Sequence, residues 1–206
     1  MQVAIIDYGA GNIGSLVNML SRKCNCSCIV ESPETGLQLN TTHCILPGVG
    51  HFGFASNQLR QNGIDARLKS FLQRGGHLLG ICLGAQLLLD YSEEGDASGL
   101  GFIPGRVEKF RSKKIAPDER IPHMGWSEVK LMQNASQMTT EEIMRFYFVH
   151  SYHMVPEQQA DVFMTSEFGN GFTAAIKRGN ITGVQFHPEK SHAFGVAFLK
   201  YWLSAS

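Results

Sequence analysis

Residues 78–86 read LLGICLGAQ, an apolar run that leads into Cys82 between two glycines. This order predicts a strand that turns sharply into a helix, because flanking glycines relieve the crowding around a residue held in a strained turn. Helical spacing of apolar residues continues over 87–89. The first N–H groups and the positive dipole end of such a helix would face the sulfur and favour its thiolate form. We therefore expect Cys82 to be a nucleophile, whereas a cysteine without this setting is more often an inert core residue.

The same strand-and-helix alternation extends through the first half of the chain. Short apolar runs occupy residues 3–7, 28–30 and 44–46, and residues 64–74 have helical periodicity. Alternating strands and helices predict a parallel sheet with helices on both faces.

After about Gly99 the pattern changes to short β-rich runs separated by Gly, Pro and Asn. The runs are residues 105–110, 127–131, 145–149, 162–167, 172–177 and 181–185. They predict an antiparallel or mixed extension of the same sheet, and residues 193–203 predict a packing helix. The expected fold is thus α/β, a three-layer sandwich with a mostly parallel central sheet. A length of 206 residues suits a single domain spanning 1–206.

Charge and composition narrow the classes of partner. Lys and Arg number 18 and Asp and Glu number 18, so the net charge is +0 and no long basic stripe is available for a phosphate backbone. This argues against a nucleic-acid partner. The apolar run near the N-terminus is too short for a secretory signal or a membrane span, which favours a cytoplasmic location and no membrane partner.

Five cysteines, an odd number, favour free thiols in a reducing compartment. Their spacing suggests no zinc site. The alternation in KCNCSCIV predicts that Cys24, Cys26 and Cys28 share one face of a strand, and Cys44 is expected in the core.

A cysteine nucleophile needs a base that takes and returns a proton, and the base needs an orienting carboxylate. Residues 183–189, GVQFHPE, supply both, because His187 and Glu189 flank a proline that stiffens the loop after a strand. Cys82, His187 and Glu189 are therefore the predicted catalytic residues. The other seven histidines are given no catalytic role, although His150 and His153 could border the site.

Five sequence blocks spread over nearly the whole chain carry a family resemblance: PGVGHFG, GICLGAQLL, IPHMGW, FVHSY and GVQFHPEKS. Together they resemble the class I, or triad, glutamine amidotransferases, and within them the glutaminase subunit of imidazole glycerol phosphate synthase. The resemblance implies the flavodoxin-like sandwich of that family. It also implies that Cys82 attacks the carboxamide of glutamine and forms a glutamyl thioester, with His187 as acid and base and Glu189 orienting it.

The resemblance further assigns binding residues. The oxyanion would be held by backbone N–H groups of Leu83 and of the loop that contains Val49 and Gly50. Glutamine-binding residues would be Gly48, Gln86, Glu94, His150, Ser151 and Tyr152. The glycines of the PGVG loop leave its peptide free to rotate, so we expect a low basal activity until a partner's ligand binds.

Nothing in the sequence predicts a way to use the ammonia, and no cofactor or metal site is expected. The resemblance implies a heterodimer with a (β/α)₈-barrel cyclase, which makes imidazole glycerol phosphate and aminoimidazole carboxamide ribotide in histidine biosynthesis. The residues expected to face this cyclase are Asn12, His123, Met124, Trp126 and Lys190.

Two departures from the family pattern keep alternatives open: Ala85 stands where Met is common, and Ser127 where Asn is common. A paralogous subunit could supply ammonia to a sugar-modifying synthase of surface polysaccharide biosynthesis. A stand-alone cysteine hydrolase would explain the cysteine and histidine motifs but not PGVG, PHMGW or Lys190. A non-catalytic binding subunit is disfavoured by the intact catalytic residues.

Overall fold

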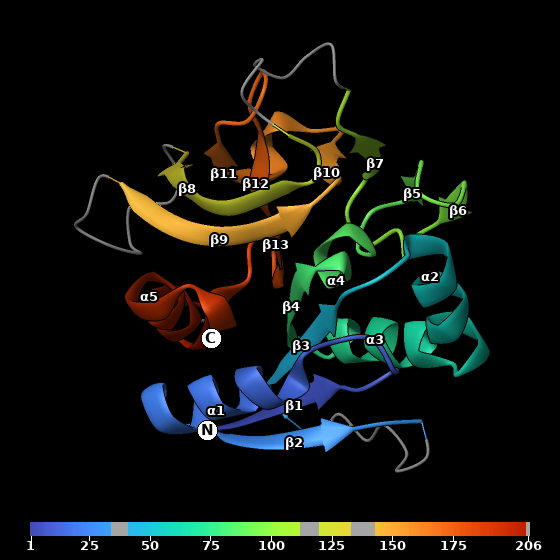
Figure 1. Cartoon of the computed structure of the whole chain (residues 1–206). Coiled ribbons are helices and arrows are strands. Elements are labelled where there is room, and N and C mark those ends of the chain that lie inside the picture. Colours follow the sequence, from blue (N-terminus) through green and yellow to red (C-terminus); the bar gives the residue numbers. More distant parts are fainter. Residues whose placement is uncertain (34–40, 112–119, 133–142, 205–206) are drawn as a thin grey trace.

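A computed structural model describes residues 1–33, 41–111, 120–132 and 143–204 (Figure 1). One half of its sheet is parallel, in the order β2-β1-β3-β4-β13. These strands are β1 (Gln2–Ile6), β2 (Ser27–Glu31), β3 (His43–Gly48), β4 (His77–Cys82) and β13 (Ile181–Val184). Because the strands are parallel, their carboxyl ends meet at one edge of the sheet, where Gly48 of β3 pairs with Cys82 of β4.

The other half of the sheet is mostly antiparallel. From β13 the order continues through β12, β10 and β7 to two short strands, β5 and β6, while β11, β8 and β9 branch off from β12. The strands are β5 (Tyr91–Ser92), β6 (Ala97–Ser98), β7 (Gly105–Lys109), β8 (His123–Leu131), β9 (Met144–His150), β10 (Tyr152–Pro156), β11 (Val162–Ser166) and β12 (Phe172–Arg178).

Helices cover both faces of the parallel half, as Figure 1 shows. On one side lie α1 (Ile13–Lys23) and α5 (His192–Leu203), and on the other α2 (Phe52–Gln61) and α3 (Ile64–Gln73). The alternation of side chains along β1 supplies both cores, since Val3 and Ile5 join one apolar cluster and Ala4 and Ile6 join the other. The expected α/β sandwich with a mostly parallel sheet and an antiparallel extension is confirmed.

The helix after Cys82 is shorter than the sequence predicted. Helix α4 spans only Leu83–Gln86, and residues 87–89 form turns. The carbonyl groups of these turn residues accept hydrogen bonds from backbone N–H groups of residues 100–103, so they are not available to continue the helix. The prediction of a longer helix was therefore wrong. Only one turn of helix follows Cys82, so the macrodipole that faces its sulfur is that of a single turn.

The three cysteines near residue 26 also differ from expectation. Cys24 is the C-terminal cap of α1, Cys26 lies in the following turn, and only Cys28 is in β2. The prediction that they share one strand face was wrong, because α1 runs on to Lys23 and Asn25 then reverses the chain with a φ of 56°. Cys44 is fully buried, as predicted. No helix in the described ranges has both the length and the apolar character to cross a membrane.

Candidate active site

Cys82 occupies a strained turn at the carboxyl end of the parallel strands. It is the last residue of β4 and the N-terminal cap of α4, with φ 55° and ψ −110°. A positive φ is uncommon for a residue with a Cβ atom, and such strain is held in place by the packing around it. The flanking glycines are required by that packing: a Cβ atom on Gly84 would collide with the carbonyl oxygen of Leu46, and one on Gly80 would lie 2.6 Å from the carbonyl oxygen of Gly84.

His187 follows β13 on the neighbouring parallel strand and is held by backbone contacts. Its N–H donates to the carbonyl of Tyr147 in β9 at 2.9 Å, and its carbonyl accepts from the Ser191 hydroxyl at 2.6 Å. Ser191 in turn accepts a hydrogen bond from the Tyr147 N–H at 3.0 Å. The imidazole is oriented by Glu189, whose Oε1 lies 2.8 Å from Nδ1. The loop therefore fixes both the position and the ring plane of the histidine.

The electrostatics of His187 favour its charged form. Burial opposes that form, but the interactions with Cys82 and Glu189 outweigh it and raise the pKa of His187 to about 10. The other ring nitrogen, Nε2, is buried and makes no hydrogen bond within the described part of the chain. The sulfur thus influences the imidazole as a close neighbour, without a regular hydrogen bond to it.

Cys82 and His187 open into the same cavity, which has a volume of about 300 Å³. Its lining comprises Val49, Gly50, Cys82, Leu83, Gln86, Glu94, Pro122, Val149, His150, Ser151, Tyr152 and His187. All the predicted oxyanion residues and five of the six predicted glutamine-binding residues are in this set. The exception is Gly48, which lies at the end of β3 beside Cys82, and Glu189 stands behind His187. Pro122 and Val149 were not predicted individually, although both fall in quoted sequence blocks.

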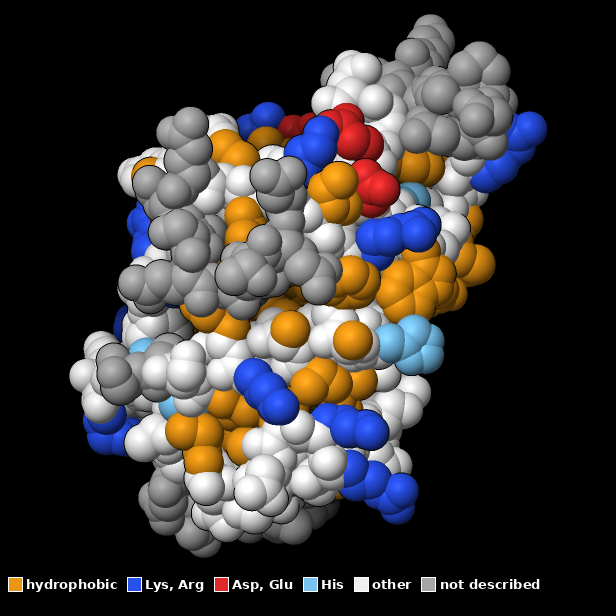
Figure 2. Space-filling view, turned by 90° about the vertical axis from the view of Figure 1, so that its left-hand side faces the viewer, with side chains coloured by type: hydrophobic (Ala, Val, Ile, Leu, Met, Phe, Trp, Pro, Cys, Tyr) orange, Lys and Arg blue, Asp and Glu red, His pale blue; other side chains and the backbone are white. Residues whose placement is uncertain are grey.

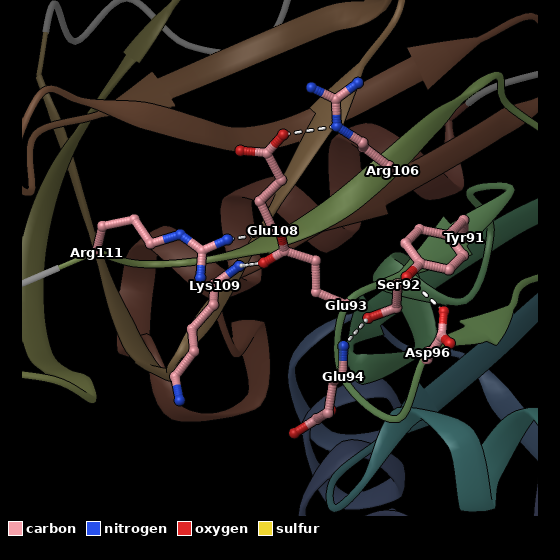
Figure 3. A network of polar contacts seen from close by, with 9 residues as sticks. All are labelled: Tyr91, Ser92, Glu93, Glu94, Asp96, Arg106, Glu108, Lys109 and Arg111. Atoms are coloured by element: carbon pink, nitrogen blue, oxygen red, sulfur yellow. Dashed lines mark hydrogen bonds and ion pairs between the residues drawn. The ribbon is translucent and has the colours of Figure 1, made fainter.

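The Glu94 side chain is presented to the cavity by a well-anchored loop (Figure 3). The carboxylate of the preceding residue, Glu93, accepts hydrogen bonds from the Lys109 N–H at 2.8 Å and from Arg111 at 2.6 Å. Figure 3 shows Glu93 and Glu94 pointing in opposite directions. Oε2 of Glu94 accepts the N–H of Phe52 at 2.9 Å, so this carboxylate also caps the start of α2.

Comparison with known proteins agrees with this geometry. The family model described as glutamine amidotransferase class-I matches residues 4–201. The chain belongs to this family. It is 45% identical to imidazole glycerol phosphate synthase subunit HisH 2 of Methanococcus maripaludis, over 98% of each chain. It is 40% identical to the protein of the same name in Pseudomonas aeruginosa, over 96% of each chain.

Solved structures show the same fold. The structure of PurLQS from Thermotoga maritima matches this amidotransferase with a TM-score of 0.73 at 16% identity, over 98% of this chain and 97% of that one. A crystal structure of a glutamine amidotransferase gives a TM-score of 0.73 at 17% identity, over 98% and 96%.

Of the five residues predicted to face a partner, four are exposed in the amidotransferase and one is buried. Asn12, Met124, Trp126 and Lys190 are exposed, with Met124 at 62% and Trp126 at 41%. Trp126 stacks on His192 with ring centroids 5.4 Å apart. His123, by contrast, is buried, and its ring nitrogens lie 2.9 Å from His150 and 2.8 Å from Ser127. His123 therefore supports the exposed strand from inside.

The two departures from the family pattern also have different surroundings. Ala85 belongs to α4, where it is fully buried in the core and is not part of the cavity wall. Ser127 is half-buried on β8, one residue from Trp126. Only Ser127 is thus near the exposed apolar residues.

Proposed function

We propose that this chain hydrolyses glutamine to glutamate and ammonia, and passes the ammonia to a (β/α)₈-barrel cyclase that makes imidazole glycerol phosphate and aminoimidazole carboxamide ribotide in histidine biosynthesis. The observation that carries the proposal is the strained Cys82, which shares one cavity with His187, itself paired with the buried Glu189 side chain. The relatives named above are synthase subunits of this kind, and they match the chain over nearly its whole length.

In the proposed reaction the Cys82 sulfur attacks the side-chain carbonyl carbon of glutamine. Backbone N–H groups of Leu83 and of the loop with Val49 hold the oxygen that becomes negative. The His187 imidazolium gives a proton to the amide nitrogen, the carbon–nitrogen bond breaks, and ammonia leaves a glutamyl thioester on Cys82. Water, deprotonated by the same histidine, then attacks the thioester, and cleavage of the carbon–sulfur bond releases glutamate.

The wall of the cavity suits a zwitterionic amino acid with an amide side chain. The Glu94 carboxylate can pair with the α-ammonium group of the substrate. His150 stays neutral, because burial lowers its pKa to about 3. A neutral imidazole here adds no second positive charge beside His187.

An acceptor for ammonia is expected to dock over the exposed apolar residues of β8. Ammonia released into water near neutral pH is protonated and loses its nucleophilic lone pair, so a covered passage preserves its reactivity. Met124 and Trp126 are large hydrophobic side chains left exposed on β8, a common sign of a protein interface. Trp126 packs against Tyr147, whose carbonyl accepts the His187 N–H. Lys190 lies over the Tyr147 ring at 5.6 Å and adds a positive charge there.

The face of the molecule that carries α5 offers little support for a nucleic-acid partner. Figure 2 looks onto the α5 side, where hydrophobic and basic side chains are interspersed over much of the face and acidic side chains gather near its top. Such a mixture differs from the continuous basic stripe that neutralises a phosphate backbone.

We also propose that residues 1–206 form one domain and that the protein acts in the cytoplasm.

Replacement of Cys82 by Ser tests the proposed function. The Cys82→Ser variant, purified with the cyclase, is expected to lose synthesis from glutamine but to keep synthesis from an added ammonium salt, because only ammonia production is removed. Cys24→Ser, at a half-buried thiol outside the cavity, is the matched control and should retain both reactions. Glutamine-dependent synthesis that survives in Cys82→Ser would refute the assignment.

A second candidate differs only in the ammonia acceptor. Ser127 departs from the family pattern next to the exposed apolar residues. This departure allows a paralogous subunit that serves a sugar-modifying synthase. Co-purification from the native cell separates the two candidates, because each predicts a different partner.

A further inference from the structure

Gln185 contacts the reacting sulfur but has no place in the reaction described above. It follows β13, two residues before His187, and its side chain is fully buried. Its amide nitrogen Nε2 lies 3.7 Å from the Cys82 sulfur, and its amide oxygen accepts a hydrogen bond from Gln86 Nε2 at 3.0 Å. Both ends of this side chain are therefore engaged with residues of the cavity.

The orientation of the Gln185 amide follows from one backbone carbonyl. The carbonyl oxygen of Tyr152 can only accept, and it lies 3.0 Å from Gln86 Nε2. Gln86 must therefore turn its NH₂ group toward Tyr152, and its second N–H points at the oxygen of Gln185. The NH₂ group of Gln185 is then left to donate to the sulfur.

The Tyr152 carbonyl is itself held by a second donor. His150 Nδ1 lies 2.7 Å from it and must carry a proton, so Nε2 of the neutral His150 is an acceptor. His123 then donates through Nδ1 at 2.9 Å, and its Nε2 lies 2.8 Å from the Ser127 hydroxyl oxygen. The acceptor-only carbonyl and the neutral His150 thus assign the proton between the two histidines, and these contacts anchor the carbonyl from β8.

We propose that Gln185 is a positioning residue for the Cys82 nucleophile. Rotation about the Cα–Cβ bond of Cys82 would otherwise leave its sulfur several orientations, and a donor of fixed direction selects one of them and favours an electron-rich sulfur. This inference rests on the proposed glutaminase function, because positioning matters only if the sulfur attacks a substrate.

Two substitutions separate donation from packing. Gln185→Met keeps the length of the side chain and removes both hydrogen bonds. Gln185→Glu keeps the shape and the bond from Gln86 but replaces the donor to the sulfur with an acceptor. Thr182→Val, a buried and nearly isosteric change in β13, is the matched control and should behave as the wild type.

The variants are to be compared by glutaminase kinetics in the complex with the cyclase, by thermal unfolding, and by the rate at which iodoacetamide alkylates Cys82, followed on the Cys82 peptide. We expect kcat to fall by about tenfold or more in both Gln185 variants, with KM changed by less than about threefold, and the alkylation rate to fall in parallel. A merely structural role would change the unfolding temperature without slowing alkylation of the folded protein.

Wild-type kcat and alkylation rate in a folded Gln185→Met variant would overturn the inference. If that variant does not fold, Gln185→Glu serves as the test, and a wild-type kcat in Gln185→Glu has the same force. Failure of the proposed function is distinguishable, because the wild-type complex would then produce no glutamate, whereas the alkylation rates of the free chain would still report on Gln185.

Discussion

Replacement of Glu189 by Gln should destabilise the folded chain in a pH-dependent way. The carboxylate lies 2.8 Å from the His187 imidazole, and the two side chains are only 5% and 3% exposed, so solvent screens their interaction little. Burial disfavours the imidazolium, yet Cys82 and Glu189 together raise the pKa of His187 from 6.5 to about 10. Gln keeps the shape of Glu189 and removes the charge.

The magnitude follows from the pKa difference between the folded and unfolded chains. A tenfold change in a protonation equilibrium is worth about 1.4 kcal/mol, so the raised pKa of His187 stabilises the fold by at most about 4 kcal/mol at pH ~7. Glu189 is one of two groups that raise this pKa, and its loss should remove about 2 kcal/mol. Because the folded pKa is the higher one, this stability is fully present below about pH 6.5 and is lost as the pH rises through about 10.

Urea unfolding of the wild type and Glu189→Gln at several pH values between about 6 and 10 measures the effect. The difference in free energy of unfolding should stay near its full value up to about pH 8 and then shrink as the pH approaches about 10. Glu108→Gln is the control, since Glu108 forms an exposed pair with Arg106 and should change stability by less than about 1 kcal/mol at any of these pH values. A loss in Glu189→Gln that is the same at both ends of the range would refute the reasoning.

Three further substitutions probe other parts of the fold. Gly84→Ala places a Cβ atom against the Leu46 carbonyl oxygen, so we expect a loss of about 2 kcal/mol in urea unfolding and a large drop in glutaminase rate. Tyr8→Phe removes a buried hydroxyl that has no hydrogen-bond partner in the described residues, and calorimetry should show unchanged stability or a gain of about 1 kcal/mol. Arg178→Ala leaves the buried Asp161 without its bidentate partner, and urea unfolding should show a loss of stability.

Local patterns were enough to predict the parallel strands and the turn that holds Cys82. The apolar runs are short and separated by polar or glycine-containing segments. The collision that a Cβ atom on Gly84 would cause explains why the glycine pattern marks the turn at Cys82. The pairing of His187 with Glu189 was also predictable, because it depends on two residues in one short loop.

Features set by distant contacts were not predictable. Helix α4 ends early because residues 100–103 take the carbonyl groups of residues 87–89, and nothing in the local periodicity signals that competition. Strand β10 was missed because it ends in a proline and its burial pattern lacks a clear alternation. Gln185 stands just before the FHPE sequence, but the local sequence could not predict its contacts. Its two partners, Gln86 and Cys82, are 99 and 103 positions away in the chain.

The central claim is that the Cys82 sulfur carries the glutamyl group during turnover. Acid quenching of the complex during glutamine hydrolysis, followed by peptide mass spectrometry, tests it directly. The account predicts a glutamyl adduct on the peptide that contains Cys82, formed during turnover and absent without glutamine. Steady hydrolysis with no adduct, or with the adduct on Cys24, Cys26, Cys28 or Cys44, would contradict it.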